Sequence, residues 1–430
     1  MKTPNAASAT GWLITGCAEI LTLRGAVPRR GRALADLGII RDGALLIRDG
    51  RIAAAGPRRH VERLRESRRA HKLDLGGRVV LPGFVDSHTH LVFAASRAAE
   101  YEQRIAGASY EEIARSGGGI LSSVRQLRQA TSAELKISAL AHLAEFAAHG
   151  TTTIEAKSGY GLTWESERKI LLLLRELERE QPLEIVRTFL GAHVVPPGFR
   201  APSRKRADEY VDLLCRRWIP QVAAERLAEF CDVYCDRGAF SVAQGRKILT
   251  AARACGLRLR IHAEQLARTG AARLAVELHA ASADHLEKLS SGDIRALARS
   301  NVTCTMLPGC CFHLGLAHYG PARKLIDAGA IVALATDFNP GTSPTVSMPM
   351  ILSLACTQMR MAPGEAIAAA TINAAYSLGR ADRLGSLEVG KFADLAAFGV
   401  ASYREIPYYF GVNRCSLTMK RGEIIYSRLR

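Results

Sequence analysis

Two histidines separated by one residue, His88 and His90, follow the short apolar run at residues 84–85. Because residues two apart in a strand face the same side, both imidazoles can point into one pocket and bind one metal ion. Such a pair more often consists of ordinary polar residues at a strand end, so other residues of the chain must show whether it binds a metal ion. Further short runs end in polar residues of the same kind, at His193, His262, His285 and Asp337.

Three imidazoles and one carboxylate would make a catalytic metal site. His88, His90 and His262 would supply nitrogen and Asp337 oxygen, a set that suits Zn²⁺ or iron and leaves one position for water. A metal ion lowers the pKa of such a water toward about 7 and supplies hydroxide at neutral pH. The pattern therefore predicts metal-assisted hydrolysis.

These residues need a scaffold that brings several strand ends together. Eight short apolar runs alternate with helical stretches, near residues 84–87, 152–156, 185–190, 230–234, 258–261, 281–284, 302–307 and 331–336. Eight such units predict an α/β fold, the (β/α)8 or TIM barrel, whose active sites lie at the carboxyl ends of the strands. The segment 131–149, for example, has an N-cap, an apolar face and Gly150 as its stop.

The two ends of the chain show a different pattern of short strands. Asp49-Gly50 lies between two apolar runs and predicts a hairpin, and Arg421-Gly422 marks a similar turn near the C-terminus. We expect both ends to join in one β-sandwich domain beside the barrel. The predicted organisation is residues 1–81 and 381–430 for the two halves of the sandwich, and residues 82–380 for the barrel.

Composition limits the class of protein. The hydrophobic fraction of 48% and the charged fraction of 23% are typical of a globular protein. The formal charge of +17 would fit a polyanion partner, but the basic residues are dispersed among acids without an aromatic platform, so an anionic small-molecule substrate fits equally well and no nucleic acid is expected. No apolar run is long enough for a membrane span, and the ten cysteines lack CxxC pairs, which favours free thiols and a cytoplasmic location.

Longer motifs around these residues resemble the amidohydrolase superfamily and, within it, the imidazolonepropionase family. The resemblance covers nearly the whole chain, and the segments KSGYG, GAH and ATDFNPGTSP are the specific ones. The similar segments are HTHLVFA (88–94), SGGGI (116–120), EAKSGYG (155–161), FLGAH (189–193), HAEQL (262–266), SADHL (282–286) and TDFNPGTS (336–343).

The resemblance implies an activity in histidine degradation. The ring of 4-imidazolone-5-propanoate would be opened to N-formimidoyl-L-glutamate, with metal-bound hydroxide attacking the ring carbonyl. Asp337 would pass a proton to the leaving nitrogen, His285 would stabilise the developing charge and His193 would polarise the carbonyl. Glu264 is a further candidate for proton transfer, because related deaminases carry a glutamate where this chain has Gln265.

The resemblance also implies a substrate pocket. Arg97 would hold the propionate as a bidentate fork, which suits an anionic substrate on physical grounds as well. Residues 339–341 are also typical of an ordinary turn. For Lys157 we expect a structural role. The other substrate or product contacts would come from Tyr160, His193, Gln265, Asn339, Gly341 and Thr342.

Several alternatives remain open at this point. The ligand set accepts zinc and iron alike. Relatives with two metal ions use a carboxylated lysine at the end of the fourth strand, and residues 234–237 offer none, so we expect one ion per subunit. A homodimer is what the resemblance suggests. Another cyclic amidohydrolase or a heterocycle deaminase of the same superfamily would share the metal ligands, and a non-catalytic basic scaffold or polyanion-binding barrel is the alternative from another class.

Overall fold

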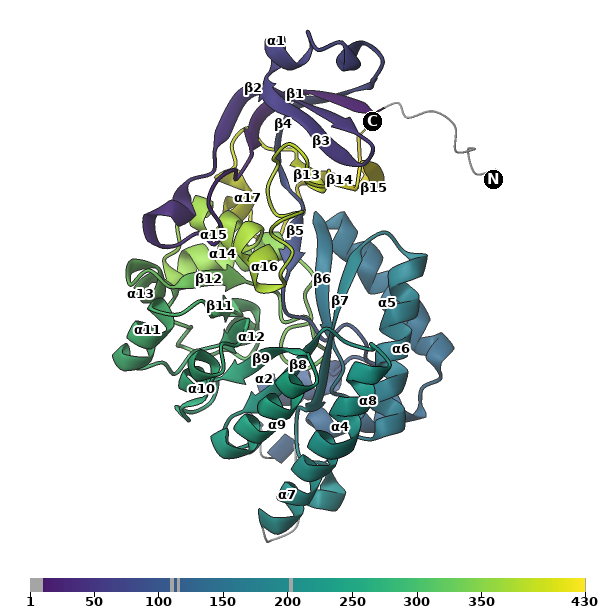
Figure 1. Ribbon diagram of the computed structural model, residues 1–430, viewed down its shortest axis with the longest axis vertical. Helices are drawn as coiled ribbons and strands as arrows, with labels where there is room; N and C mark the ends of the chain where they lie inside the picture. Colours follow the sequence, from purple (N-terminus) through teal and green to yellow (C-terminus); the bar gives the residue numbers. More distant parts are fainter. Residues whose placement is uncertain (1–10, 109–111, 114–116, 201–203, 430) are drawn as a thin grey trace.

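Eight parallel strands form the central sheet, in which neighbours in sequence are neighbours in space (Figure 1). The computed structural model describes residues 11–108, 112–113, 117–200 and 204–429, so Ser116 of the SGGGI segment lies outside the described residues. The predicted (β/α)8 architecture is confirmed. The strands are β5 (Phe84–Asp86), β6 (Thr151–Lys157), β7 (Glu184–Ala192), β8 (Phe230–Cys235), β9 (Arg258–Ala263), β10 (Ser282–His285), β11 (Thr303–Met306) and β12 (Ile331–Leu334).

Helices follow the strands and cover the outside of the barrel. The predicted helix at residues 131–149 is α5, whose N-cap Thr131 and third residue Glu134 bond each other's backbone amides, and it ends before Gly150 at φ 89°. The principal helices are α5 (Ser132–Ala148), α6 (Trp164–Glu180), α7 (Arg204–Leu213), α8 (Ile219–Ala224), α9 (Val242–Ala254), α10 (Ala271–Glu277), α11 (Ser291–Ala298), α13 (Ala322–Asp327), α14 (Met348–Met359), α15 (Pro363–Ala369) and α16 (Ile372–Ser377). Further helices lie in the loops after β5 and β11, at α2 (Ala98–Ile105), α4 (Ile120–Gln129) and α12 (Pro308–His313).

The barrel is closed between β5 and β12 by a few specific contacts rather than by a regular ladder. The Asp86 carboxylate accepts hydrogen bonds from the Thr336 amide at 3.1 Å and hydroxyl at 2.6 Å. Beyond the strand ends, Thr89 and Phe338 form a single parallel bridge. The His88–His90 segment therefore lies just past β5, not within a strand as predicted, but that bridge keeps it extended.

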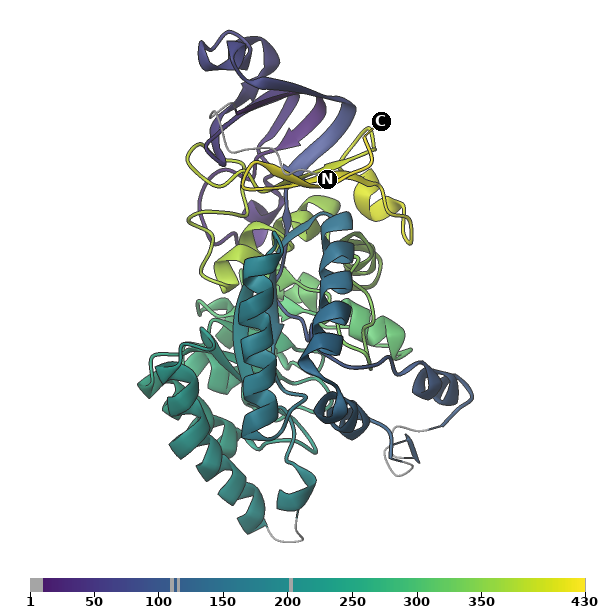
Figure 2. The same ribbon diagram turned by 90° about the vertical axis from the view of Figure 1, so that its right-hand side faces the viewer.

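Both chain ends build one seven-stranded mixed sheet beside the barrel, in the order β15-β14-β13-β4-β1-β2-β3. Figure 2 shows its C-terminal strands, in yellow, next to the N-terminal strands in purple. The predicted turns at Asp49-Gly50 and Arg421-Gly422 join β2 to β3 and β14 to β15. The strands are β1 (Trp12–Leu21), β2 (Ile39–Arg48), β3 (Arg51–Pro57), β4 (His71–Pro82), β13 (Leu395–Phe398), β14 (Cys415–Lys420) and β15 (Glu423–Ser427).

The two halves of this sheet enclose a shared apolar core, with Ile14 and Leu45 from the N-terminal strands and Leu395 and Leu417 from the C-terminal strands. The sheet domain packs at the amino end of the barrel strands, where the Gly83 amide donates to the Asp394 carbonyl at 3.0 Å. The carboxyl ends of the barrel strands therefore face away from it. Within the described ranges, no helix combines the length and apolarity needed to cross a bilayer.

Candidate metal centre and active site

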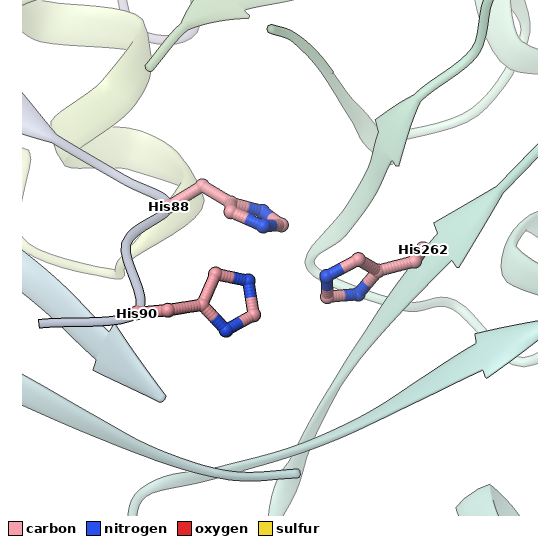
Figure 3. A group of neighbouring side chains, drawn as sticks. All are labelled: His88, His90 and His262. Atoms are coloured by element: carbon pink, nitrogen blue, oxygen red, sulfur yellow. The ribbon is translucent and has the colours of Figure 1, made fainter. Parts of the chain in front are cut away.

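The three predicted imidazole ligands meet at the carboxyl end of the barrel. His88 and His90 come from the segment after β5 and His262 from β9, and their ligand nitrogens lie within 4.8 Å of one another. Figure 3 shows the three rings gathered around one common space. Asp337, which follows β12, places its Oδ1 3.6 Å from His88 Nε2 and 3.7 Å from His90 Nε2. All four predicted ligands are thus brought together.

Buried carboxylates orient two of these imidazoles. His88 Nδ1 donates to Asp284 Oδ2 at 2.8 Å, and His262 Nδ1 donates to Asp232 Oδ1 at 3.1 Å. These bonds leave the Nε2 atoms of both rings as lone-pair donors, and both atoms are buried without a hydrogen-bond partner. Around a protein-bound metal ion, imidazoles usually donate one ring nitrogen to a carboxylate and direct the other toward the ion. The residues of this centre therefore fit a metal ion.

The electrostatics of the centre favour neutral imidazoles and a protonatable carboxylate. Burial, and then the positive charge of Lys157, hold the pKa of His88 well below its usual range, and burial does the same for His90. Burial raises the pKa of Asp337 to about 6, although His285 and His262 oppose the change. His88 and His90 therefore present unprotonated nitrogens at neutral pH, while Asp337 titrates near the pH range in which a group can carry protons.

A layer of buried charges lies next to the imidazoles, and sequence reasoning missed most of it. Lys157 forms ion pairs with Glu155 at 2.8 Å and with Asp232 at 2.9 Å. Arg260 pairs with Asp284 at 3.2 Å, and the side chains of all these residues are fully buried. The available signal was a charged residue inside a predicted strand, which occurs in β6, β8 and β9.

The predicted ring contacts lie beside the metal ligands. His193 stacks on His90 with ring centroids 5.1 Å apart, and Tyr160 lies 5.7 Å from the same ring. His193 Nδ1 donates to the Gly159 carbonyl at 3.1 Å. Burial, and then the nearby His262, lower the pKa of His193 to about 3, so its other nitrogen is an uncharged acceptor at neutral pH.

His285 lies on the other side of the centre, where it groups with His88 and Asp337. Burial lowers its pKa, but the carboxylate of Glu287 outweighs burial and leaves the pKa above its ordinary value. Glu287 Oε1 lies 3.7 Å from His285 Nδ1 and accepts a bond from Cys311 Sγ at 3.4 Å. The raised pKa favours the protonated form of His285, which is suited to face a developing negative charge.

Glu264 is placed away from the metal centre. Its carboxylate accepts hydrogen bonds from the backbone amides of Thr269 at 2.7 Å, Gly270 at 2.9 Å and Ala272 at 3.2 Å, at the start of α10. Its backbone is left-handed at φ 56°, which turns the side chain out of the strand direction. Both oxygens are occupied by this helix start, so the predicted role of Glu264 in proton transfer is corrected to a structural one.

Gln265 faces the loop after β11, where its amide lies 3.5 Å from Cys310 Sγ. Cys310 is buried in α12, and Cys310 and Cys311 are both free thiols. Burial raises the pKa of the Cys310 thiol well above its ordinary value, so it stays protonated. These cysteines lie in the loop beside the centre. Among the described residues, neither cysteine belongs to a group of side chains that could hold a metal ion.

The predicted turn and the predicted substrate arginine lie together. Asn339 Oδ1 accepts from the amides of Gly341 at 2.9 Å and Thr342 at 2.7 Å, so its side chain organises the turn. A Cβ at Gly341 would overlap the Arg97 guanidinium, which explains the glycine. Arg97 Nε donates to Glu100 Oε2 at 2.9 Å, a partner that sequence reasoning missed. One edge of the guanidinium is thus held by Glu100, and Nη1 lies against the turn.

Comparisons with known proteins agree with this geometry. The sequence pattern of the amidohydrolase family matches residues 79–425. An imidazolonepropionase from Solibacter usitatus (strain Ellin6076) is 50% identical over 416 residues, covering 96% of this chain and 98% of that protein. One from Geobacillus kaustophilus (strain HTA426) is 47% identical, covering 95% and 96%. Among solved structures, an adenosine deaminase from Xanthomonas campestris with bound zinc has a TM-score of 0.71 at 17% identity, covering 97% of this chain and 93% of that one, and so shares the fold.

Proposed function

We infer the function of this chain from its family, because the chain belongs to the amidohydrolases and, within them, to the imidazolonepropionases. It is a metal-dependent hydrolase that opens the ring of 4-imidazolone-5-propanoate to N-formimidoyl-L-glutamate. The observation that carries this conclusion is the meeting of three imidazoles and Asp337 at one end of the barrel, with a candidate carboxylate-binding arginine nearby.

We propose that His88, His90, His262 and Asp337 hold one metal ion per subunit. When bound, such an ion supplies Lewis acidity and lowers the pKa of a coordinated water. The donor set suits zinc or iron, and the zinc in the Xanthomonas campestris deaminase supports zinc. A second ion is not expected, because residues 234–237 at the end of β8, the fourth barrel strand, include no lysine that could bridge two ions.

The chain's own residues then account for the proton movements. A water oxygen adds to the ring carbonyl carbon, and Asp337 takes the proton that the water loses. The carbon–nitrogen bond breaks, and Asp337 returns this proton to the leaving nitrogen. His285 faces the negative charge that develops on the carbonyl oxygen, and the uncharged His193 contacts the ring.

Substrate binding is proposed for the loops around these residues. Arg97 binds the propionate through the guanidinium edge that Glu100 does not occupy. Tyr160 contacts the ring and Gln265 lines the wall. Contact of Asn339, Gly341 and Thr342 with the product's carboxylate stays a prediction from the sequence, because the Gly341 and Thr342 amides donate to Asn339 Oδ1. A cytoplasmic location and a homodimer stay predictions from the sequence, as do the domain bounds at residues 81 and 380.

The test is turnover of imidazolonepropionate by purified protein, with and without a chelator. Loss of the substrate's ultraviolet absorbance is followed together with the formation of formimidoylglutamate. We expect turnover that stops on metal removal and returns when zinc or iron is restored. Ammonia release from an aminated heterocycle, with imidazolonepropionate left intact by fully metallated protein, would move the function to a deaminase.

A further inference from the structure

We propose that Lys157 is a positioning residue that holds the three metal-binding imidazoles in place through two buried carboxylates. This inference rests on the proposed function in one respect, namely that the centre binds a metal ion. Lys157 contacts no proposed ligand through its side chain. Its ammonium group instead lies between two carboxylates from β6 and β8, each of which leads to a different part of the centre.

The first connection runs to His262. Lys157 Nζ lies 2.9 Å from Asp232 Oδ2, and the same carboxylate accepts the bond from His262 Nδ1 at 3.1 Å. A carboxylate held by an ion pair on one side and by a hydrogen bond on the other is restricted in rotation, so it presents its oxygen to His262 in one direction. The ring of His262 consequently keeps Nε2 toward the centre.

The second connection runs to the His88–His90 segment. Lys157 Nζ lies 2.8 Å from Glu155 Oε1, and Glu155 Oε2 accepts a hydrogen bond from the Thr89 amide at 3.2 Å. The Thr89 hydroxyl also donates to the Glu155 carbonyl at 2.7 Å, and the Lys157 amide donates to the Thr89 carbonyl at 3.0 Å. Thr89 separates the two histidines, so both of its backbone groups are fixed from the Lys157 side.

Arg260 provides an instructive contrast. It pairs with Asp284, which orients His88, and it also donates to the Ser87 carbonyl at 2.7 Å, so both contacts lead to the same ligand, His88. Lys157 reaches both strand segments that carry imidazoles. Removing its charge would take away the cation that pairs directly with both Glu155 and Asp232, and buried carboxylates that lose such a partner repel each other and move. The effect should therefore appear at the metal centre, not only in stability.

The experiment measures zinc affinity of the full chain after chelator treatment, by competition with a chromophoric zinc chelator. For Lys157→Met we expect affinity about 10–100-fold weaker, the range typical of residues that orient metal ligands. The matched control is Lys420→Met. Lys420 is also a buried lysine, paired with Asp394 at 2.7 Å, but it lies at the other end of the barrel. Its variant should lose stability and keep wild-type zinc affinity.

A spectroscopic measurement separates positioning from general damage. In cobalt(II)-substituted protein, the visible absorption bands report ligand geometry, and we expect them to shift in Lys157→Met and not in Lys420→Met. If Lys157→Met does not fold, Glu155→Gln is measured instead, because it keeps the side-chain volume and weakens one connection. Affinity several-fold weaker is expected there.

The positioning role would be overturned if Lys157→Met kept wild-type zinc affinity and an unchanged cobalt spectrum. The same result in Glu155→Gln decides where Lys157→Met does not fold. Either outcome would leave the proposed function intact. Equal losses of affinity in Lys157→Met and Lys420→Met would overturn the positioning role as well. Wild-type protein that binds no zinc and no cobalt would overturn the metal centre itself, and with it both proposals.

Discussion

The two ends of the barrel both contain buried ion pairs, but they use them differently. At the amino end, Glu184 of β7 lies 2.8 Å from Arg380, 2.6 Å from Arg383 and 3.7 Å from Lys420, so three cations from two chain segments converge on one carboxylate. Since Lys420 belongs to the sheet domain, this cluster joins the two domains. At the carboxyl end, the carboxylates bond imidazoles as well as cations, and ring nitrogens remain free.

The difference shows what distinguishes an ion cluster that stabilises the fold from one that orients the side chains of the candidate metal centre. Lys157 and Lys420 are both buried lysines with a close carboxylate partner. Asp232, one partner of Lys157, also accepts a hydrogen bond from the proposed metal ligand His262, whereas Asp394, the partner of Lys420, accepts from the Arg421 amide at 2.8 Å. The two lysine–carboxylate pairs are similar in burial and charge. Their functions differ because of the group that makes the second contact with the carboxylate.

The largest expected effect is that of Asp337→Asn at the carboxyl end. The amide keeps the shape but cannot accept and return a proton, so we expect turnover to fall by roughly 10²–10⁴-fold. Thermal stability without metal should be retained, because burial already disfavours the charged form of Asp337. The measurement is steady-state turnover beside thermal melting. Asp394→Asn is the amino-end control, and if it lost as much turnover per folded molecule, the two ends would not differ as described.

Arg97→Ala should have the next largest effect. A hydrogen-bonded pair with a charged partner is worth about 1.5–3 kcal/mol, so KM should rise roughly 10–100-fold with a smaller change in kcat. Arg97→Lys keeps the charge and loses the fork, and should lie between wild type and alanine. Steady-state kinetics on imidazolonepropionate measure both. A fall in kcat at unchanged KM would place Arg97 in the chemistry instead of in substrate binding.

The meeting of the four proposed metal ligands was largely predictable from the sequence, because strand ends in a barrel converge and each proposed ligand lies near the end of a predicted strand. The supporting layer was not. Asp232 and His262 are 30 residues apart, and only the lateral order of β8 and β9 brings them together. Glu264 was misjudged because its neighbour His262 faces the centre, whereas the left-handed backbone at Glu264 turns its carboxylate to the start of α10.

The pH dependence of metal binding is expected to be a smaller effect. Asp337 has a pKa of about 6 without metal, and a proton on this carboxyl competes with the ion. Zinc affinity should therefore be nearly constant above pH 7 and fall by up to tenfold for each pH unit below about 6. His88 and His90 add no further loss there, because their pKa values lie well below the usual range. Chelator competition between pH 5 and 8 measures this slope, and a flat profile would argue against Asp337 as a ligand.

The smallest expected effect on catalysis is that of Glu184→Gln at the amino end. The free energy of unfolding should fall by roughly 2 kcal/mol, less than the 3–5 kcal/mol typical of a fully buried pair, because Arg383 is partly exposed. Burial raises the pKa of Glu184, but Lys420 and Arg383 outweigh it and leave the pKa below its ordinary value. The stability difference from wild type should therefore be complete above about pH 4.5 and shrink as the pH falls through this lowered pKa. Urea unfolding at several pH values measures this difference.

Zinc affinity and KM of Glu184→Gln should stay within about twofold of wild type, since the Glu184 cluster has no bond to an imidazole. A tenfold change in either quantity would show that the two ends of the barrel are coupled.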